Sequence, residues 1–117
     1  MEGEIKNKAK EFAKAILECE EYKAFIENTE KLNKNAEAQK LLKEFQENQM
    51  VLRFNGFTPQ LMDELRELQI KINQNKIIQD FAKSQDELTI LLKRTNTVIS
   101  MRIGMQFGFS SGGGCCG

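Results

Sequence analysis

The stretch Asn55-Gly56-Phe57-Thr58-Pro59-Gln60-Leu61 decides the fold of this 117-residue chain, because it holds the end of one helix and the start of the next. Gly56 suits the left-handed position that commonly follows the last residue of a helix. Thr58 is a good N-cap, and Pro59 fits the first helical position, where the missing N–H is not needed. Phe57, just before the cap, is placed for a hydrophobic staple. Two helices joined by a very short link are therefore predicted here.

On both sides of this turn, apolar residues recur in steps of three and four, the spacing of one helix face. The helix after the turn carries Leu61, Leu65, Leu68 and Ile72. The helix before it is predicted to start after the N-cap Asn35, and it carries Ala38, Leu41, Leu42, Phe45, Gln49 and Leu52.

The pattern of the first third of the chain predicts helix, with no clear helix-breaking signal between residues 4 and 32. One apolar stripe contains Ile5, Ala9, Phe12, Ile16 and Cys19. A second stripe contains Tyr22, Phe25, Ile26, Thr29 and Leu32, and it is out of phase with the first. The phase change predicts a bend near residues 19–21. Cys19 is expected to be a small buried residue of the first stripe.

The last helix is predicted to start after Asn75 and to be the longest. Its stripe is close to a coiled-coil seam and contains Ile78, Phe81, Gln85, Leu88, Leu92, Thr95, Ile99 and Arg102. The polar members Gln85 and Thr95 are expected at the edge of the stripe, with a role in register or subunit contact as the alternative. Two further apolar residues, Phe107 and Phe109, flank Gly108 beyond the helix and are predicted to dock on a partner or on the same bundle. The candidate partner interface contains Leu88, Leu92, Ile99, Phe107 and Phe109.

Short links between helices favour antiparallel neighbours. The sequence thus predicts an all-α fold, a bundle of about four to five antiparallel helices with a long C-terminal helix. Residues 1–105 are expected to form one helical domain and residues 106–117 a flexible Gly/Ser/Cys tail. Which apolar stripes form the core and which form an interface is not decided by periodicity.

The composition excludes several functions. Seventeen basic and seventeen acidic residues cancel, so a direct nucleic-acid partner is not expected. The chain has no histidine, which removes His-based acid/base and nucleophilic pairs. It has no phosphate-binding glycine motif and no apolar run of membrane-spanning length. A non-enzymatic protein without membrane insertion is predicted. The absence of a secretory signal makes the cytoplasm the default location.

Two adjacent cysteines, Cys115 and Cys116, follow a Ser/Gly-rich segment at the C-terminus. A cluster of iron and sulfide generally needs four thiolates, so these two would supply half of a shared iron–sulfur or metal site. An inert or merely oxidisable tail, or a leftover cloning sequence, are the alternatives.

Three segments together resemble the YlbF/YheA/YmcA family over roughly residues 4–104. They are Glu20-Glu21-Tyr22-x-x-Phe25, then Ala36-Glu37-Ala38-Gln39-x-Leu41-Leu42-x-Glu44-Phe45-Gln46, and finally Phe81-x-x-Ser84-Gln85-x-x-Leu88-x-x-Leu91-Leu92-x-x-Thr95-Asn96-x-Val98-Ile99-Ser100. The Cys-bearing tail is similar to that of the YlbF-type branch, although it has fewer cysteines.

The resemblance implies a small helical regulator that associates with itself or with relatives. It also implies an assembly that carries iron–sulfur clusters and modulates a membrane-bound endoribonuclease, and with it mRNA maturation, competence, sporulation and biofilm formation. By the same resemblance Cys115 and Cys116 would be cluster ligands. The leading hypothesis is an adaptor in such an assembly. The alternatives are a metal or redox carrier that uses the tail, and a homo-oligomeric structural protein.

Overall fold

The computed structural model describes residues 2–108, and within that range it contains five helices and no strand. The helices are α1 (Glu2–Glu18), α2 (Glu20–Lys34), α3 (Ala36–Asn55), α4 (Pro59–Gln74) and α5 (Lys76–Ile103). The predicted all-α class, the bend near residues 19–21 and the long C-terminal helix are confirmed.

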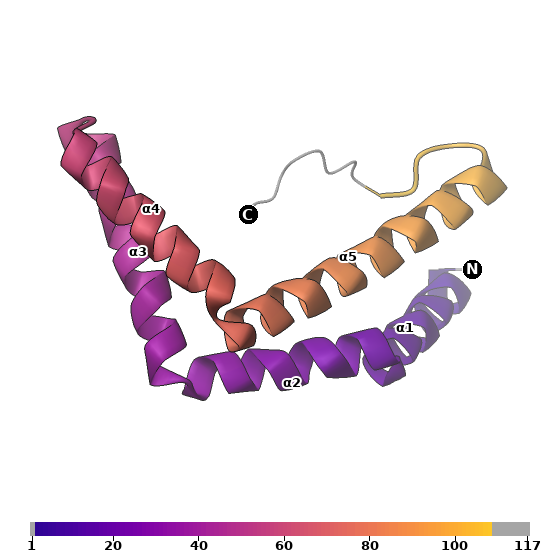
Figure 1. The fold of residues 1–117 in the computed structure, drawn as a ribbon. Helices are drawn as coiled ribbons and strands as arrows, with labels where there is room; N and C mark the ends of the chain where they lie inside the picture. Colours follow the sequence, from indigo (N-terminus) through magenta and orange to yellow (C-terminus); the bar gives the residue numbers. More distant parts are fainter. Residues whose placement is uncertain (1, 109–117) are drawn as a thin grey trace.

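The helices form a V with two arms (Figure 1). One arm is the hairpin of α3 and α4, and the other is the antiparallel pair of α2 and α5, extended by α1. The molecule measures 60 × 29 × 20 Å and its radius of gyration is 19.0 Å. A compact chain of this length would have a radius of gyration of about 13 Å. The antiparallel neighbours expected from the short links are thus arranged as two pairs that meet at one end.

Each arm joins the other through a corner only one residue long. At the first corner, the backbone N–H of Asn35 donates to the carbonyl of Leu32 at 3.2 Å and closes α2. The Asn35 Oδ1 accepts from the backbone N–H of Ala38 at 2.8 Å and caps α3. The side chain of Gln39 reaches back, and its Nε2 donates to the Leu32 carbonyl at 2.9 Å. Thus one asparagine ends one helix and starts the next.

The second corner repeats this arrangement between α4 and α5. The backbone N–H of Asn75 donates to the carbonyl of Ile72 at 3.1 Å. The Asn75 Oδ1 accepts from the backbone N–H of Ile78 at 3.0 Å, and the Nε2 of Gln79 donates to the Ile72 carbonyl at 3.1 Å. The predicted N-caps Asn35 and Asn75 are therefore both confirmed.

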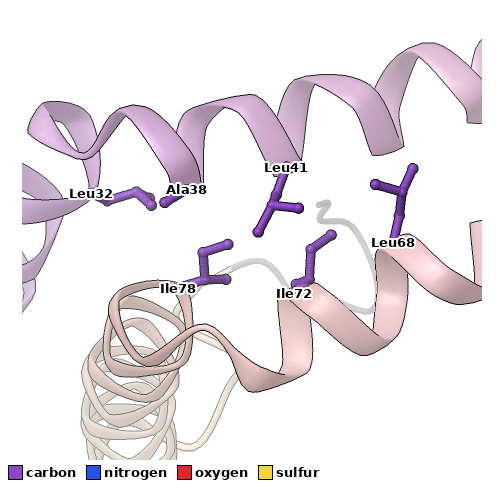
Figure 2. Close-up of a cluster of buried hydrophobic side chains, with 6 residues drawn as sticks. All are labelled: Leu32, Ala38, Leu41, Leu68, Ile72 and Ile78. Carbon is purple, nitrogen blue, oxygen red and sulfur yellow. The ribbon is translucent and has the colours of Figure 1, made fainter.

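The buried core lies where the two corners meet. Its side chains face one another from four helices in Figure 2: Leu32, Ala38, Leu41, Leu68, Ile72 and Ile78. Further along the α2–α5 arm, the rings of Phe25 and Phe81 lie 5.7 Å apart between centroids. The contacts that hold the two arms together are therefore concentrated at the vertex.

The turn at the far end of the hairpin has the predicted positive φ at Gly56 and the predicted N-cap at Thr58. Gly56 has a φ of +86° and a ψ of −179°, so its backbone is extended rather than in the predicted left-handed helical conformation; the positive φ still favours glycine, and the Gly56 N–H donates to the Leu52 carbonyl. The Thr58 Oγ1 accepts from the backbone N–H of Leu61 at 3.1 Å. The staple expected of Phe57 is wrong, because 70% of this residue's surface is exposed.

Among the helices of residues 2–108, none combines the length and the hydropathy that a membrane crossing requires.

Candidate protein-interaction surface

α1 carries an amphipathic stripe that the described part of the chain leaves uncovered. None of its residues is buried, and Ile5 and Leu17 are 71% and 53% exposed. α1 lies at the end of its arm and contacts mainly α2. Cys19, at the break between these helices, has an extended backbone and is half-buried, so the expectation that it is fully buried is wrong. Most helical stability in proteins comes from packing of an amphipathic face, so α1, whose apolar face is uncovered, is suited to stabilisation by a partner.

An apolar groove lies between α1 and the C-terminal half of α5. Its volume is about 320 Å³, and its apolar lining comes from Phe12, Leu92, Ile99 and Phe107. Leu92, Ile99 and Phe107 are predicted interface residues. The structure brings them together with Phe12, which the sequence analysis assigned to the first apolar stripe and not to an interface. Leu88, the third predicted interface residue on α5, is half-buried and does not line the groove.

The segment after α5 turns back and completes the groove. Gly104 ends the helix with a φ of +76°, in the left-handed region. The backbone N–H of Phe107 then donates to the Ser100 Oγ at 2.9 Å, and that of Gly108 donates to the Asn96 Oδ1 at 2.8 Å. These two bonds hold residues 107 and 108 against the helix. The flexible tail was expected to begin at residue 106. In the structure, however, residues 107 and 108 are hydrogen-bonded to α5.

A second exposed apolar cluster lies at the turn between α3 and α4, and we call it the hairpin tip. It contains Met50, Val51, Phe54 and Phe57, which are 48%, 42%, 74% and 70% exposed. Figure 1 places this turn at the end of one arm and the last turn of α5 at the end of the other. Sequence reasoning missed the hairpin tip. The sequence did hold a signal for this cluster. Three apolar residues, Met50, Val51 and Phe54, lie off the main apolar stripe of their helix, just before the Asn55-Gly56 turn.

The described residues offer no metal centre. No group of three or more His, Cys, Asp or Glu side chains in residues 2–108 is arranged to hold a metal ion. Cys115, Cys116 and Phe109 lie outside the described residues, so the shared iron–sulfur site and the docking of Phe109 stay predictions.

Comparison with known proteins agrees with this architecture. The family described as control of competence regulator ComK, YlbF/YmcA, matches residues 5–104. The fold is similar to that of a chain in the crystal structure of Bacillus subtilis RicA in complex with RicF, with a TM-score of 0.79 and 20% sequence identity. The similarity covers 89% of this chain and 96% of that chain. No curated protein matches the chain.

Proposed function

Because the chain belongs to the YlbF/YmcA family of competence regulators, we propose that it is a non-enzymatic adaptor. In this proposal it binds a second helical protein of the same family through the groove and the uncovered stripe of α1. Through that assembly it modulates an endoribonuclease in the cytoplasm, and with it the mRNA processing that governs competence, sporulation and biofilm formation.

The uncovered apolar face of the α1–α5 arm carries the proposal. Large exposed apolar patches commonly mark interaction sites. The accessible surface of the chain is 9357 Å², whereas a compact monomer of 13.4 kDa would expose about 6500 Å². The surplus exceeds the roughly 800 Å² per partner of a standard interface. A protein partner is therefore a more natural ligand for this surface than a small molecule.

One solved structure of similar fold is that of RicA in complex with RicF, which is a protein–protein assembly. That assembly supports a protein partner for this chain as well. The composition supports a non-enzymatic role, since a chain without histidine lacks the commonest general acid and base.

The proposal is tested by binding of a purified family relative from the same genome, followed by calorimetry or light scattering. The wild-type chain is expected to bind, and Leu92→Asp is expected to weaken binding at least tenfold, because it places a charge in the groove. Ile70→Asp is the matched control, since Ile70 is 49% exposed on α4 and is outside the groove lining. Equal binding by the wild type and Leu92→Asp would contradict the proposed surface.

The link to RNA needs a separate measurement. Deleting the gene and restoring it as wild type or as Leu92→Asp, followed by sequencing of transcript 5′ ends, tests it. The proposal expects processed ends to be lost on deletion, restored by the wild type and not restored by the variant. Unchanged processing in the deletion strain would rule out the RNA-processing role and leave the pairing role standing.

A further inference from the structure

We infer that Asn96 and Ser100 are positioning residues for the groove. They fasten the segment after α5, residues 104–108, to the helix, and we call this segment the strap. By doing so they hold Phe107 in the groove wall before a partner arrives. The inference rests on the proposed function, because it concerns how the groove is kept ready for the helical partner.

The strap is joined to α5 mainly through side-chain acceptors of the helix. Gly104 reverses the chain, with a φ of +76° and a ψ of 15°, and its N–H donates to the Ser100 carbonyl at 3.0 Å. Beyond this residue, two hydrogen bonds join the strap to α5 within the described part of the chain. One runs from the Phe107 N–H to the Ser100 Oγ at 2.9 Å, and the other from the Gly108 N–H to the Asn96 Oδ1 at 2.8 Å. Because residues four apart lie on one helix face, the two acceptors are neighbours on α5.

The last residue of the strap approaches Asn96 so closely that a side chain there would have to displace it. A β-carbon added to Gly108 would lie 2.9 Å from the Asn96 Oδ1 and 3.4 Å from its Cγ. Gly108 does not have a positive φ, in contrast to Gly104, so the close approach and not the backbone conformation requires glycine here. The sequence thus supplies both halves of this contact, a side chain that accepts and a residue without a side chain that comes near enough to donate.

Packing alone does not explain why Phe107 stays at the groove. Phe107 is 58% exposed, so it buries little apolar surface against the helix. A second hollow of about 500 Å³ lies on the other side of Asn96, and its lining includes Gly104 and Met105 of the strap. Met105 is 68% exposed. The strap is therefore held at its two ends, by the end of α5 at Gly104 and by the hydrogen bonds of its last two residues.

A fastened strap spares the partner the cost of ordering it. Fixing a backbone residue costs conformational entropy, and a site that is ordered in advance does not pay this cost on binding. A neutral hydrogen bond shifts an equilibrium by a net factor of roughly two to ten. When the strap leaves the helix, only the fastened fraction of the chains presents Phe107 in the groove, and the apparent affinity for a partner falls with that fraction. Loss of both bonds should therefore weaken partner binding although every apolar residue of the groove is kept.

A direct contact of Asn96 with the partner is the competing role. The Gly108 N–H needs an acceptor, so it fixes the Asn96 Oδ1 toward the strap and leaves the Nδ2 hydrogens for other acceptors. Aspartate keeps an oxygen acceptor at this position and removes the Nδ2 donors, whereas alanine removes both. Asn96→Asp and Asn96→Ala together separate the positioning role from a direct contact.

The first test is hydrogen exchange of the last two strap amides in the free chain, measured by NMR. Asn96→Ala should speed exchange at Gly108, and Ser100→Ala at Phe107, by a factor of roughly two to ten, whereas Asn96→Asp should stay near the wild type. Thr97→Ala is the matched control, because it removes a hydroxyl from the same part of α5 whose hydrogen bond stays within the helix. Alanine favours helix more than Asn, Ser or Thr does, so α5 is expected to stay intact in these variants.

The second test is calorimetry with the same family relative that tests the proposed function. Asn96→Ala should weaken binding about threefold, and the double variant Asn96→Ala, Ser100→Ala about tenfold. Asn96→Asp and Thr97→Ala should bind like the wild type. Gly108→Ala disturbs the same contact from the strap side, so it should also weaken binding although α5 is unchanged.

Three results would each overturn the inference and leave the proposed function standing. They are exchange at Gly108 that is unchanged in Asn96→Ala, a double variant that binds the relative like the wild type, and an Asn96→Asp variant that binds as weakly as Asn96→Ala. The last of these would assign Asn96 to direct contact with the partner. A wild type that binds no relative would contradict the proposed function itself, and the inference would fall with it.

Discussion

Replacing Ile78 by alanine is expected to lower the free energy of unfolding of the whole fold, because it removes packing between the two arms. Ile78 is 6% exposed and belongs to the vertex core, where residues from both arms meet. Its backbone N–H is also the one capped by Asn75, but the alanine variant keeps that bond. The substitution therefore changes packing at the vertex and leaves the corner intact.

The magnitude follows from the buried carbon that is lost. At about 0.8 kcal/mol for each buried methylene-sized group, the transfer term is about 2.4 kcal/mol. The residual cavity adds to this, so a loss of about 3–4 kcal/mol is expected, inside the measured range for such substitutions. For a chain of this length that corresponds to a melting temperature lower by roughly 10–15 °C.

The assay is urea unfolding followed by circular dichroism, repeated at several protein concentrations because association raises apparent stability. Ile90→Ala is the control, since it changes the same residue type on the same helix at a position that is 47% exposed. It should cost less than about 1 kcal/mol. Equal losses for the two variants would refute the claim that the vertex holds the fold together.

Three further predictions concern the hairpin turn, α1 and the cysteines. Gly56→Ala should lower the free energy of unfolding by about 1–3 kcal/mol, because its φ of +86° strains any other residue, whereas Gly3→Ala should cost nothing; equal values in urea unfolding would contradict this. Backbone amides of α1 should exchange with solvent faster than those of α4, and should gain protection at concentrations that favour association; hydrogen exchange that does not depend on concentration would argue against α1 as part of an interface. The monomeric chain should take up no iron–sulfur cluster in anaerobic reconstitution, because one copy has three cysteines and a cluster generally needs four thiolates; broad visible absorbance in the monomer fraction would contradict this, and its persistence in the Cys115→Ser, Cys116→Ser double variant would show that these residues are not the ligands.

The helix boundaries could be predicted from sequence because local chemistry determines them. Asn35, Thr58 and Asn75 each accept a hydrogen bond from the backbone N–H three residues later, as expected of N-caps. Gly56 supplies a positive φ that other residues avoid. These features depend on a few neighbouring residues, so a single sequence carries them in full.

Which apolar helix faces are buried against other helices could not be predicted, because periodicity shows only that a face is apolar. The stripe of α1 is as regular as those of α3 and α4, yet α1 has no buried residue. The direction of the chain at each corner depends on the backbone of Asn35 and Asn75, with ψ near 110° at both, and no sequence pattern gives that angle.

The lining of the groove was accordingly predicted in part. Leu92 and Ile99 were identified because they lie on one long stripe, and Phe107 because it lies beyond the end of that stripe. Phe12 was missed because it comes from a helix far away in sequence, which the V brings beside α5. The hairpin tip was missed because its exposed residues stand off the stripe that periodicity follows.

The one-residue corners have a mechanical consequence. A long linker would let the arms swing, but each corner here is a single asparagine that is hydrogen-bonded to the helix before it and to the helix after it. The two corners lie side by side and share one core, so rotation at one requires the other to yield as well. The V therefore acts as a stiff bracket. A protein held at the end of one arm would be kept at a constant spacing and angle from a protein held at the end of the other, and a force applied to one would reach the other through the vertex.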